Sequence, residues 1–145
     1  MAYRMLRSED AHWRPSNQMR VGNTDLALQL GAETLGARLW RLQPGQASTL
    51  HRHTDTHELY LVLEGTGRLR VDEEVLTLDA LDAVLVEPES VRQPFNDTAA
   101  AQLWLVVGAP TEAANTRDMT AERLAELYPE GPKALPPELG GGTLE

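Results

Sequence analysis

Short stretches rich in apolar and β-branched residues follow one another from Leu26 onward, and turn-forming residues separate them. Side chains of a strand point to alternate faces, and runs of this length between turn signals are typical of sandwiches and barrels. The separators are rich in Gly, Pro, Asp and Asn, which suit turns. No helical period is visible in this region. The pattern predicts nine strands, over residues 25–30, 36–43, 48–53, 58–63, 67–72, 75–78, 83–87, 91–96 and 101–108.

Strands of this number and length, closed on themselves or folded as two facing sheets, predict an all-β jelly-roll barrel over residues 25–110. Residues 1–24 lack a sustained period and predict an N-terminal arm, for which Trp13 is the expected anchor. Residues 111–145 predict a short helix followed by a flexible, loosely attached tail. Thr120 is the expected N-cap of that helix. Its apolar face consists of Leu124, Leu127 and Tyr128, and it ends before Pro129 and Gly131.

Two of the predicted strands are apolar on both faces. In residues 58–63, Glu58, Tyr60 and Val62 share one face, which leaves three leucines on the other. Residues 101–107 repeat this arrangement, with Trp104 on the inward face. Because exposed apolar patches usually mark contacts, we expect a homodimer, or the N-terminal arm, to cover the outward face.

Composition narrows the class of protein. The 145 residues fit one domain, and 41% hydrophobic with 24% charged residues describes a globular chain. The formal charge of −9 repels phosphate backbones and anionic membranes, so we expect no nucleic acid and no membrane as a partner. Cysteine is absent, which excludes Cys-ligated metal sites, and no secretory signal is recognisable. These features fit a cytoplasmic protein.

Three of the four histidines lie in one short stretch, and this is the strongest chemical signal in the chain. On a strand, His51 and His53 project from the same face. A turn follows, and a return strand then brings the Glu58 carboxylate beside them. Two imidazoles and one carboxylate are a ligand set for a first-row divalent metal with open coordination positions.

The same stretch resembles the first motif of the cupin superfamily, in which Gly45, His51, His53, Glu58 and Gly65 each hold their place. In the segment that resembles the second motif, Pro88 and Asn96 match, whereas Ser90 replaces the usual Gly. Gln93 occupies the place of the last metal-ligating His of the family. The resemblance implies a jelly-roll barrel, a metal site at His51, His53, Glu58 and Gln93, and frequent dimer formation.

Several alternatives remain open at this site. Gln93 coordinates the metal weakly or holds a metal-bound water; His57 substitutes for it, although on a regular strand it faces the other way; or the site has lost its metal. Arg92 contacts an anionic ligand or pairs with a surface carboxylate. By parity, the side chains expected to line the cavity are Tyr60, Phe95 and Trp104. His12, in the arm, is interpreted as a surface histidine.

The ligand set suits one divalent ion, Fe, Mn, Zn or Ni. With vacant positions it fits dioxygen chemistry on non-haem metal and equally Lewis-acid chemistry. The resemblance makes a dioxygenase acting on a small organic molecule the leading class, with isomerase or decarboxylase chemistry behind it. The rival hypothesis is a non-catalytic cupin that binds or senses a small molecule.

Overall fold

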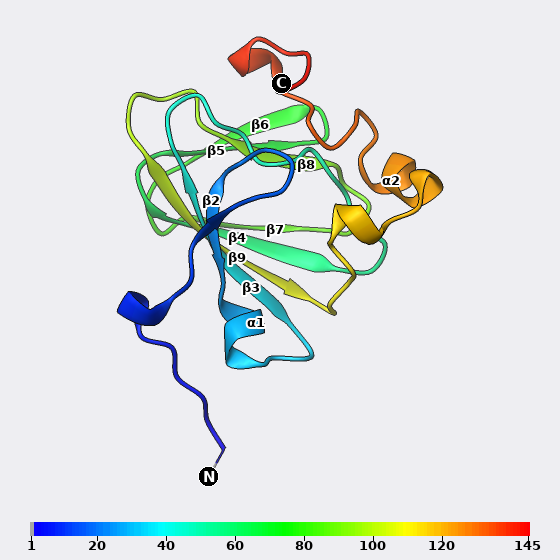
Figure 1. Ribbon diagram of the computed structural model, residues 1–145. Coiled ribbons are helices and arrows are strands. Elements are labelled where there is room, and N and C mark those ends of the chain that lie inside the picture. Colours follow the sequence, from blue (N-terminus) through cyan, green and yellow to red (C-terminus); the bar gives the residue numbers. More distant parts are fainter. Residues whose placement is uncertain (1) are drawn as a thin grey trace.

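The computed structural model describes residues 2–145 and shows the predicted all-β jelly roll (Figure 1). A six-stranded antiparallel sheet has the order β1-β2-β3-β9-β4-β7, and a three-stranded sheet has the order β6-β5-β8. The two sheets do not close into a continuous barrel. The strands are β1 Arg14–Pro15, β2 Gly22–Asp25, β3 Gly36–Leu42, β4 His57–Glu64, β5 Gly67–Val71, β6 Glu74–Leu78, β7 Ala83–Val86, β8 Arg92–Phe95 and β9 Gln102–Ala109.

Two α-helices and three 3₁₀ turns complete the described part of the chain: α1 Leu26–Leu30, α2 Ala121–Leu127, η1 Ser8–Asp10, η2 Thr116–Asp118 and η3 Pro137–Leu139. None of the helices in residues 2–145 has the length and apolar character that a membrane crossing requires.

The strand predicted at 25–30 is wrong, because these residues form α1. The Asp25 side chain accepts a hydrogen bond from the Leu28 amide and caps the helix, while Gly31 ends it with φ of 70°. The strand of this region is β2, which lies in the stretch predicted as an arm and pairs with β3. A strong N-cap and a C-terminal glycine outweigh the short apolar run.

The segment predicted as strand 48–53 is extended but not a regular strand. It touches β8 through two isolated bridges, Ala47 with Phe95 and His51 with Arg92. The amide of His53 donates to the Pro88 carbonyl at 2.9 Å. The segment therefore lies along the small sheet, which decides how the histidines reach the site.

The core lies between the two sheets, and the predicted parity of β4 is confirmed. Tyr60 and Val62 are buried, whereas Leu59 on the opposite face is 39% exposed. Trp104 of β9 is directly opposite Trp40 of β3 and Val62 of β4. The buried hydrophobic cluster consists of Met19, Val21, Leu42, Ala47, Tyr60, Val62, Leu69, Leu78, Val86, Phe95, Trp104 and Val106.

The C-terminal region is more ordered than the predicted flexible tail. Helix α2 begins where expected, with the Thr120 hydroxyl accepting from the Arg123 amide. The following segment packs on the small sheet, where Glu138 pairs with Arg70 of β5. Leu135, Leu139 and Leu144 pack against the core cluster. In Figure 1 this segment, drawn in red, lies beside the β6-β5-β8 sheet.

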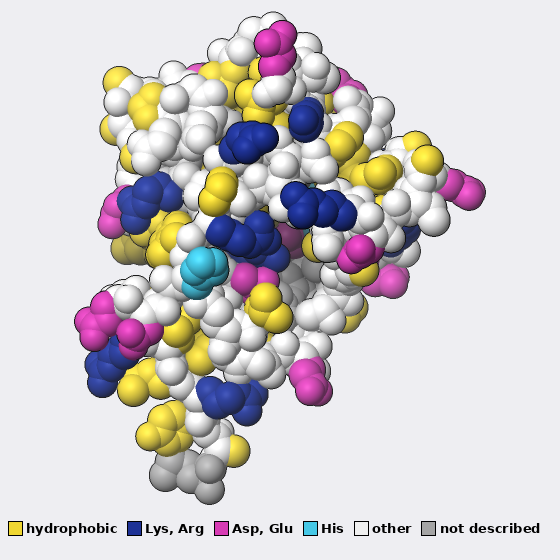
Figure 2. Space-filling view, in the orientation of Figure 1, with side chains coloured by type: hydrophobic (Ala, Val, Ile, Leu, Met, Phe, Trp, Pro, Cys, Tyr) yellow, Lys and Arg dark blue, Asp and Glu magenta, His cyan; other side chains and the backbone are white. Residues whose placement is uncertain are grey.

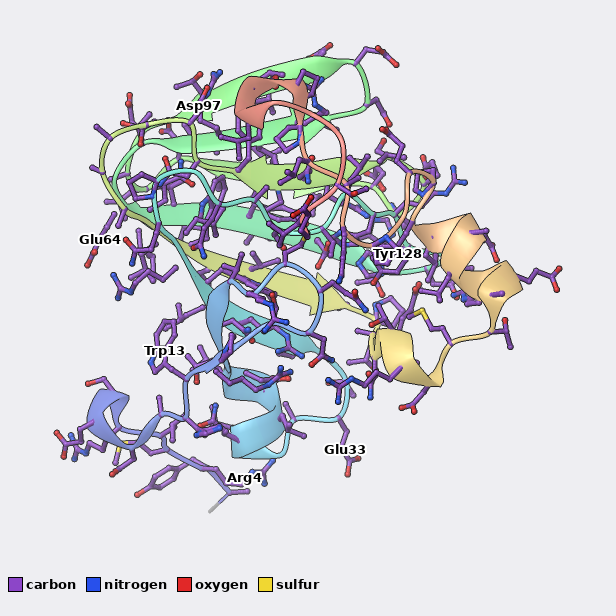
Figure 3. The ribbon with its side chains drawn as sticks, turned by 45° about the horizontal axis from the view of Figure 1, so that its top comes forward. Arg4, Trp13, Glu33, Glu64, Asp97 and Tyr128 are labelled. Carbon is purple, nitrogen blue, oxygen red and sulfur yellow. The ribbon has the colours of Figure 1, made fainter. Side chains whose placement is uncertain are left out.

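The N-terminal arm runs away from the sandwich in Figure 1. Arg4 donates to the carbonyls of Leu30 and Gly31, and the Arg41 guanidinium lies 5.6 Å from the Trp13 ring centre. Figure 3 shows Arg4 and Trp13 on the side of the molecule that carries α1. Leu59 and Leu85, on the outer face of the six-stranded sheet, remain exposed. The described arm therefore does not bury this apolar face.

Candidate metal centre

His51, His53 and Glu58 converge at one end of the sandwich, and their ligand atoms all lie within 4.8 Å of one another. Glu58 Oε1 is 3.3 Å from His51 Nε2 and 3.2 Å from His53 Nε2. The three side chains are not brought together by two neighbouring strands, as the sequence predicted. The histidine segment runs along β8 of the small sheet, whereas Glu58 belongs to β4, which pairs with β9 and β7. The ligands therefore come from the two different layers of the sandwich and meet in the interior between them.

Gly108 makes room for the Thr56 side chain next to Glu58 on the large sheet. It lies directly opposite Glu58 in the pairing of β4 with β9. A Cβ at position 108 would lie 2.8 Å from Thr56 Cγ2 and 3.4 Å from Glu58 Cγ. A larger residue would therefore clash with Thr56, which immediately precedes β4, and would only touch Glu58.

Hydrogen bonds fix which nitrogen of each imidazole faces the site. His51 Nδ1 lies 3.2 Å from the Thr49 carbonyl, which can only accept, so Nδ1 carries the proton. His53 Nδ1 lies 3.3 Å from a Glu112 carboxylate oxygen and is assigned in the same way. Both Nε2 atoms are left as acceptors directed at Glu58. This is how metal-binding histidines are usually oriented.

Glu112 is a functional residue that the sequence analysis missed. Its carboxylate accepts the amides of Thr54, Asp55 and Thr56 as well as the His53 ring. Burial alone would raise its pKa, but these hydrogen bonds outweigh burial and lower the pKa to about 2. Glu112 lies 56 or more positions from its partners, so local spacing carried no signal for it.

Glu58 is ionised and Tyr60 is neutral at physiological pH. Burial opposes the charge on Glu58, but its interactions with His51 and His53 hold its pKa well below the usual value. Tyr60 donates its hydroxyl to Glu58 Oε1 at 2.8 Å. Burial, and then the Glu58 charge, raise the pKa of Tyr60 well above its usual value.

The structure does not bring Gln93 into this group. Its side chain is buried on the other face of β8, where Nε2 donates to the carbonyls of Ser48 and Ala134, each at 2.9 Å. The neighbouring Arg92 turns inward instead, with Nε 3.8 Å from Glu58 Oε1. The alternative in which Arg92 pairs with a surface carboxylate is wrong, because this guanidinium is fully buried.

The other predicted residues divide between the site and its surroundings. Tyr60 lines the cavity, whereas Trp104 lies in the hydrophobic core between the sheets. Phe95 is also buried, but it lies on the same face of β8 as Gln93, with the Arg68 guanidinium 5.4 Å from its ring centre. His57 faces away as strand parity predicts, half-exposed and 2.9 Å from Glu87. His12 is exposed in the arm.

A cavity of about 390 Å³ opens in front of the three ligands. Arg38 and Trp40 of β3 also line the cavity, as do Leu127 and Tyr128 at the end of α2. The Tyr128 ring centre is 6.1 Å from that of His51. Figure 3 shows Tyr128 at the end of the sandwich opposite to Glu64 and Asp97. In Figure 2 basic and acidic side chains are intermixed across the visible face. The cavity is large enough for a small organic molecule.

The donor set fits a divalent metal ion. Two imidazole lone pairs and a carboxylate face one point, and acceptors so placed need a cation between them. Among the described residues, His53 Nε2 is one of the buried polar atoms without a hydrogen-bond partner. His51, His53 and Glu58 would hold the ion, which explains the unpartnered nitrogen.

Comparisons with known proteins agree with the fold. The model of the cupin domain family matches residues 38–108. A crystal structure called a sugar phosphate isomerase from a cupin superfamily, from Silicibacter pomeroyi, is 25% identical, with a TM-score of 0.67 over 74% of this chain and 76% of that one. A cupin protein from Bacteroides fragilis is 18% identical, with a TM-score of 0.64 over 83% of this chain and 98% of that one.

A protein from Thermotoga maritima, called a predicted oxalate decarboxylase, is 20% identical, with a TM-score of 0.65 over 74% of this chain and all of its own. The comparison with curated proteins found no match. The family match and the shared fold agree with the Gly, His, His and Glu spacing of residues 45–65. Residues 38–108 of the chain therefore form a cupin domain.

Proposed function

We propose that this cupin is a metal-dependent enzyme that acts on a small organic molecule in the cavity beside His51, His53 and Glu58. The observation that carries the proposal is the convergence of three ligand atoms within 4.8 Å beside a cavity of about 390 Å³. Three protein ligands leave open coordination positions, which is the arrangement of non-haem metal oxygenases. A dioxygenase is therefore the leading class.

The metal would supply a site where substrate and dioxygen bind side by side, or a Lewis acid. The chain itself positions the ligands. Glu112 and the Thr49 carbonyl fix the two imidazoles, and Tyr60 donates to Glu58. Because its pKa is raised, the Tyr60 hydroxyl stays protonated and acts as a donor rather than as a base.

Sugar phosphate isomerisation is a second candidate. One similar cupin, at 25% identity, carries that name. The residues that line the cavity include Arg14 and Arg38, and arginine side chains suit an anionic group on a substrate. Asp25 neutralises part of this charge through an ion pair with Arg38 at 2.9 Å.

Metal analysis and oxygen uptake distinguish the candidates. Protein purified without a histidine tag is analysed for bound metal and then tested for oxygen consumption with phenols, diketones and thiols. Copurified iron or manganese with oxygen uptake supports the dioxygenase. Metal binding with turnover of sugar phosphates under anaerobic conditions supports the isomerase. Metal binding without turnover of any substrate favours the non-catalytic alternative, and failure to bind any divalent ion contradicts the proposal.

The assembly is also a proposal. Leu59 and Leu85 are directly paired on the outer face of the six-stranded sheet, and both are exposed. Half-buried leucines and a valine of β4 and β9 extend this apolar face, namely Leu61, Leu63, Leu103, Leu105 and Val107. We propose that two copies of the chain pair through it. A cytoplasmic location stays a prediction.

A further inference from the structure

Arg92 occupies the position at which a fourth metal ligand would be expected. Three observations show that its side chain is held there by the surrounding structure. Its guanidinium is fully buried. Its terminal nitrogens donate to backbone carbonyls, with Glu87 the nearest at 2.7 Å. Its backbone forms the bridge with His51. The side chain is therefore held in one place beside the metal ligands.

The spacing of the second motif explains why Arg92, and not Gln93, turns inward. On β8, Arg92 and Pro94 share the face that looks into the sandwich, where they pair with Val71 and Leu69 of β5. Gln93 lies on the other face, beneath Ala134 of the C-terminal segment. When the place of the last metal-ligating His is counted forward from Pro88, it falls on residue 93. When it is counted back from Asn96, it falls on residue 92, which is the residue that faces inward.

The Nε atom of Arg92 is directed at the site. It is a buried donor without a hydrogen-bond partner among the described residues, and it lies 3.8 Å from Glu58 Oε1. Within the described part of the chain, Arg92 forms an ion pair with Glu58 and with no other acidic residue. Glu112, the next acidic group, has its own cation, Arg123, at 3.8 Å.

The charge of the loaded site follows from this arrangement. Glu58 and Arg92 cancel, and the two imidazoles are neutral, so a divalent ion keeps its full charge. An imidazole in place of Arg92 would leave the same centre one unit less positive. A fixed cation in a buried site opposes a second cation and attracts an anion, and the low local dielectric strengthens both effects.

We propose that Arg92 is a specificity-determining residue, which makes the metal centre selective for ligands that coordinate through an ionised oxygen or another anionic atom. This inference rests on the proposed metal site and names the class of ligand that it takes. Arg92 acts through the charge it places beside the ion, since its guanidinium does not line the cavity. It lowers the affinity for the metal and raises the affinity of the loaded centre for anions.

The test uses Co²⁺ as the metal, with azide as a small anionic ligand and imidazole as a neutral ligand for the same open positions. Arg92→Gln removes the charge and keeps an amide that can donate to the backbone carbonyls. We expect Co²⁺ to bind about tenfold more tightly to this variant and azide about tenfold more weakly to its Co²⁺ form, with imidazole unchanged. Titration calorimetry gives the first affinity, and the visible spectrum of bound Co²⁺ gives the other two.

Arg92→Lys is the matched control, because it keeps the charge and should keep all three affinities near those of the original chain. Should Arg92→Gln not fold, Arg92→Met, which removes the charge without adding an imidazole ligand, makes the same test for azide relative to imidazole. Equal changes for azide and imidazole, or weaker Co²⁺ binding in a folded Gln variant, would overturn the role of Arg92. If the unaltered chain binds no divalent ion, the proposed function itself fails.

Discussion

The two layers of the sandwich contribute to the site in different ways. The large sheet provides Glu58 from β4, a strand with one buried and one partly exposed face. The small layer provides both histidines and Arg92, and all four residues of β8 are buried. The outer face of the large sheet is left open by the described chain, whereas the C-terminal segment covers that of the small sheet. Alternation of polar and apolar residues therefore predicts the direction of a side chain on the large sheet, but not on β8, where both faces are buried.

The largest effect on the site is expected from removing a ligand contributed by either layer. We expect Glu58→Gln and His53→Ala each to weaken divalent metal binding by at least about 100-fold, because loss of a ligand should cost more than loss of its supporting hydrogen bond. Titration calorimetry with Zn²⁺ measures the effect. His57→Ala is the control, since His57 faces Glu87 and solvent. Equal losses in all three variants would mean that the three groups are not the ligands.

This difference between the layers explains how much could be predicted. Turn residues and the alternation of β4 were sufficient for the jelly roll, for the inward direction of Glu58 and Tyr60, and for the grouping of Glu58 with His51 and His53. The pattern failed at α1, where an Asp25 cap and Gly31 override a short apolar run. It located the strand β8 but placed Gln93 in the site, because a segment about 40 residues later buries the outer face of β8 and removes the polar alternation that shows parity.

Two substitutions on adjacent residues of β8 give a smaller but more selective effect. Arg92→His should tighten Zn²⁺ binding by about tenfold or more, since it removes a charge and adds a ligand. Gln93→His should leave metal affinity unchanged and should cost about 1–3 kcal/mol of stability, because Gln93 donates two buried hydrogen bonds. Calorimetry and urea unfolding measure the two quantities. Tighter binding in Gln93→His alone would place residue 93, not 92, in the site.

Glu112 should make stability depend on pH without removing a metal ligand. Its pKa is about 2 in the folded protein, below the usual 4.5, so its contribution is present above pH 4.5 and disappears as the pH falls toward 2. In chelator-treated protein, Glu112→Gln should cost about 2 kcal/mol at pH 7 and progressively less below pH 4.5. Urea unfolding at pH 7, 4 and 3 checks this. A difference that stays constant over this range would contradict the assignment.

The outer face of the large sheet should affect assembly and leave the metal site unchanged. Leu59→Glu with Leu85→Glu should convert a dimer into a species of the 16.0 kDa chain mass, because charges buried at an interface are costly. Light scattering after size exclusion measures the mass, and Zn²⁺ affinity should not change. Leu28→Glu, on α1 and 76% exposed, is the control. A monomer before any substitution would rule out this interface.

Diffraction data collected at the absorption edge of a soaked metal, zinc or manganese, test the central claim most directly. We predict one anomalous peak at about 2.0–2.2 Å from His51 Nε2, His53 Nε2 and a Glu58 oxygen, with Gln93 turned away. A peak coordinated by Gln93, or a well-diffracting soaked crystal with metal bound only at other surfaces, would contradict it.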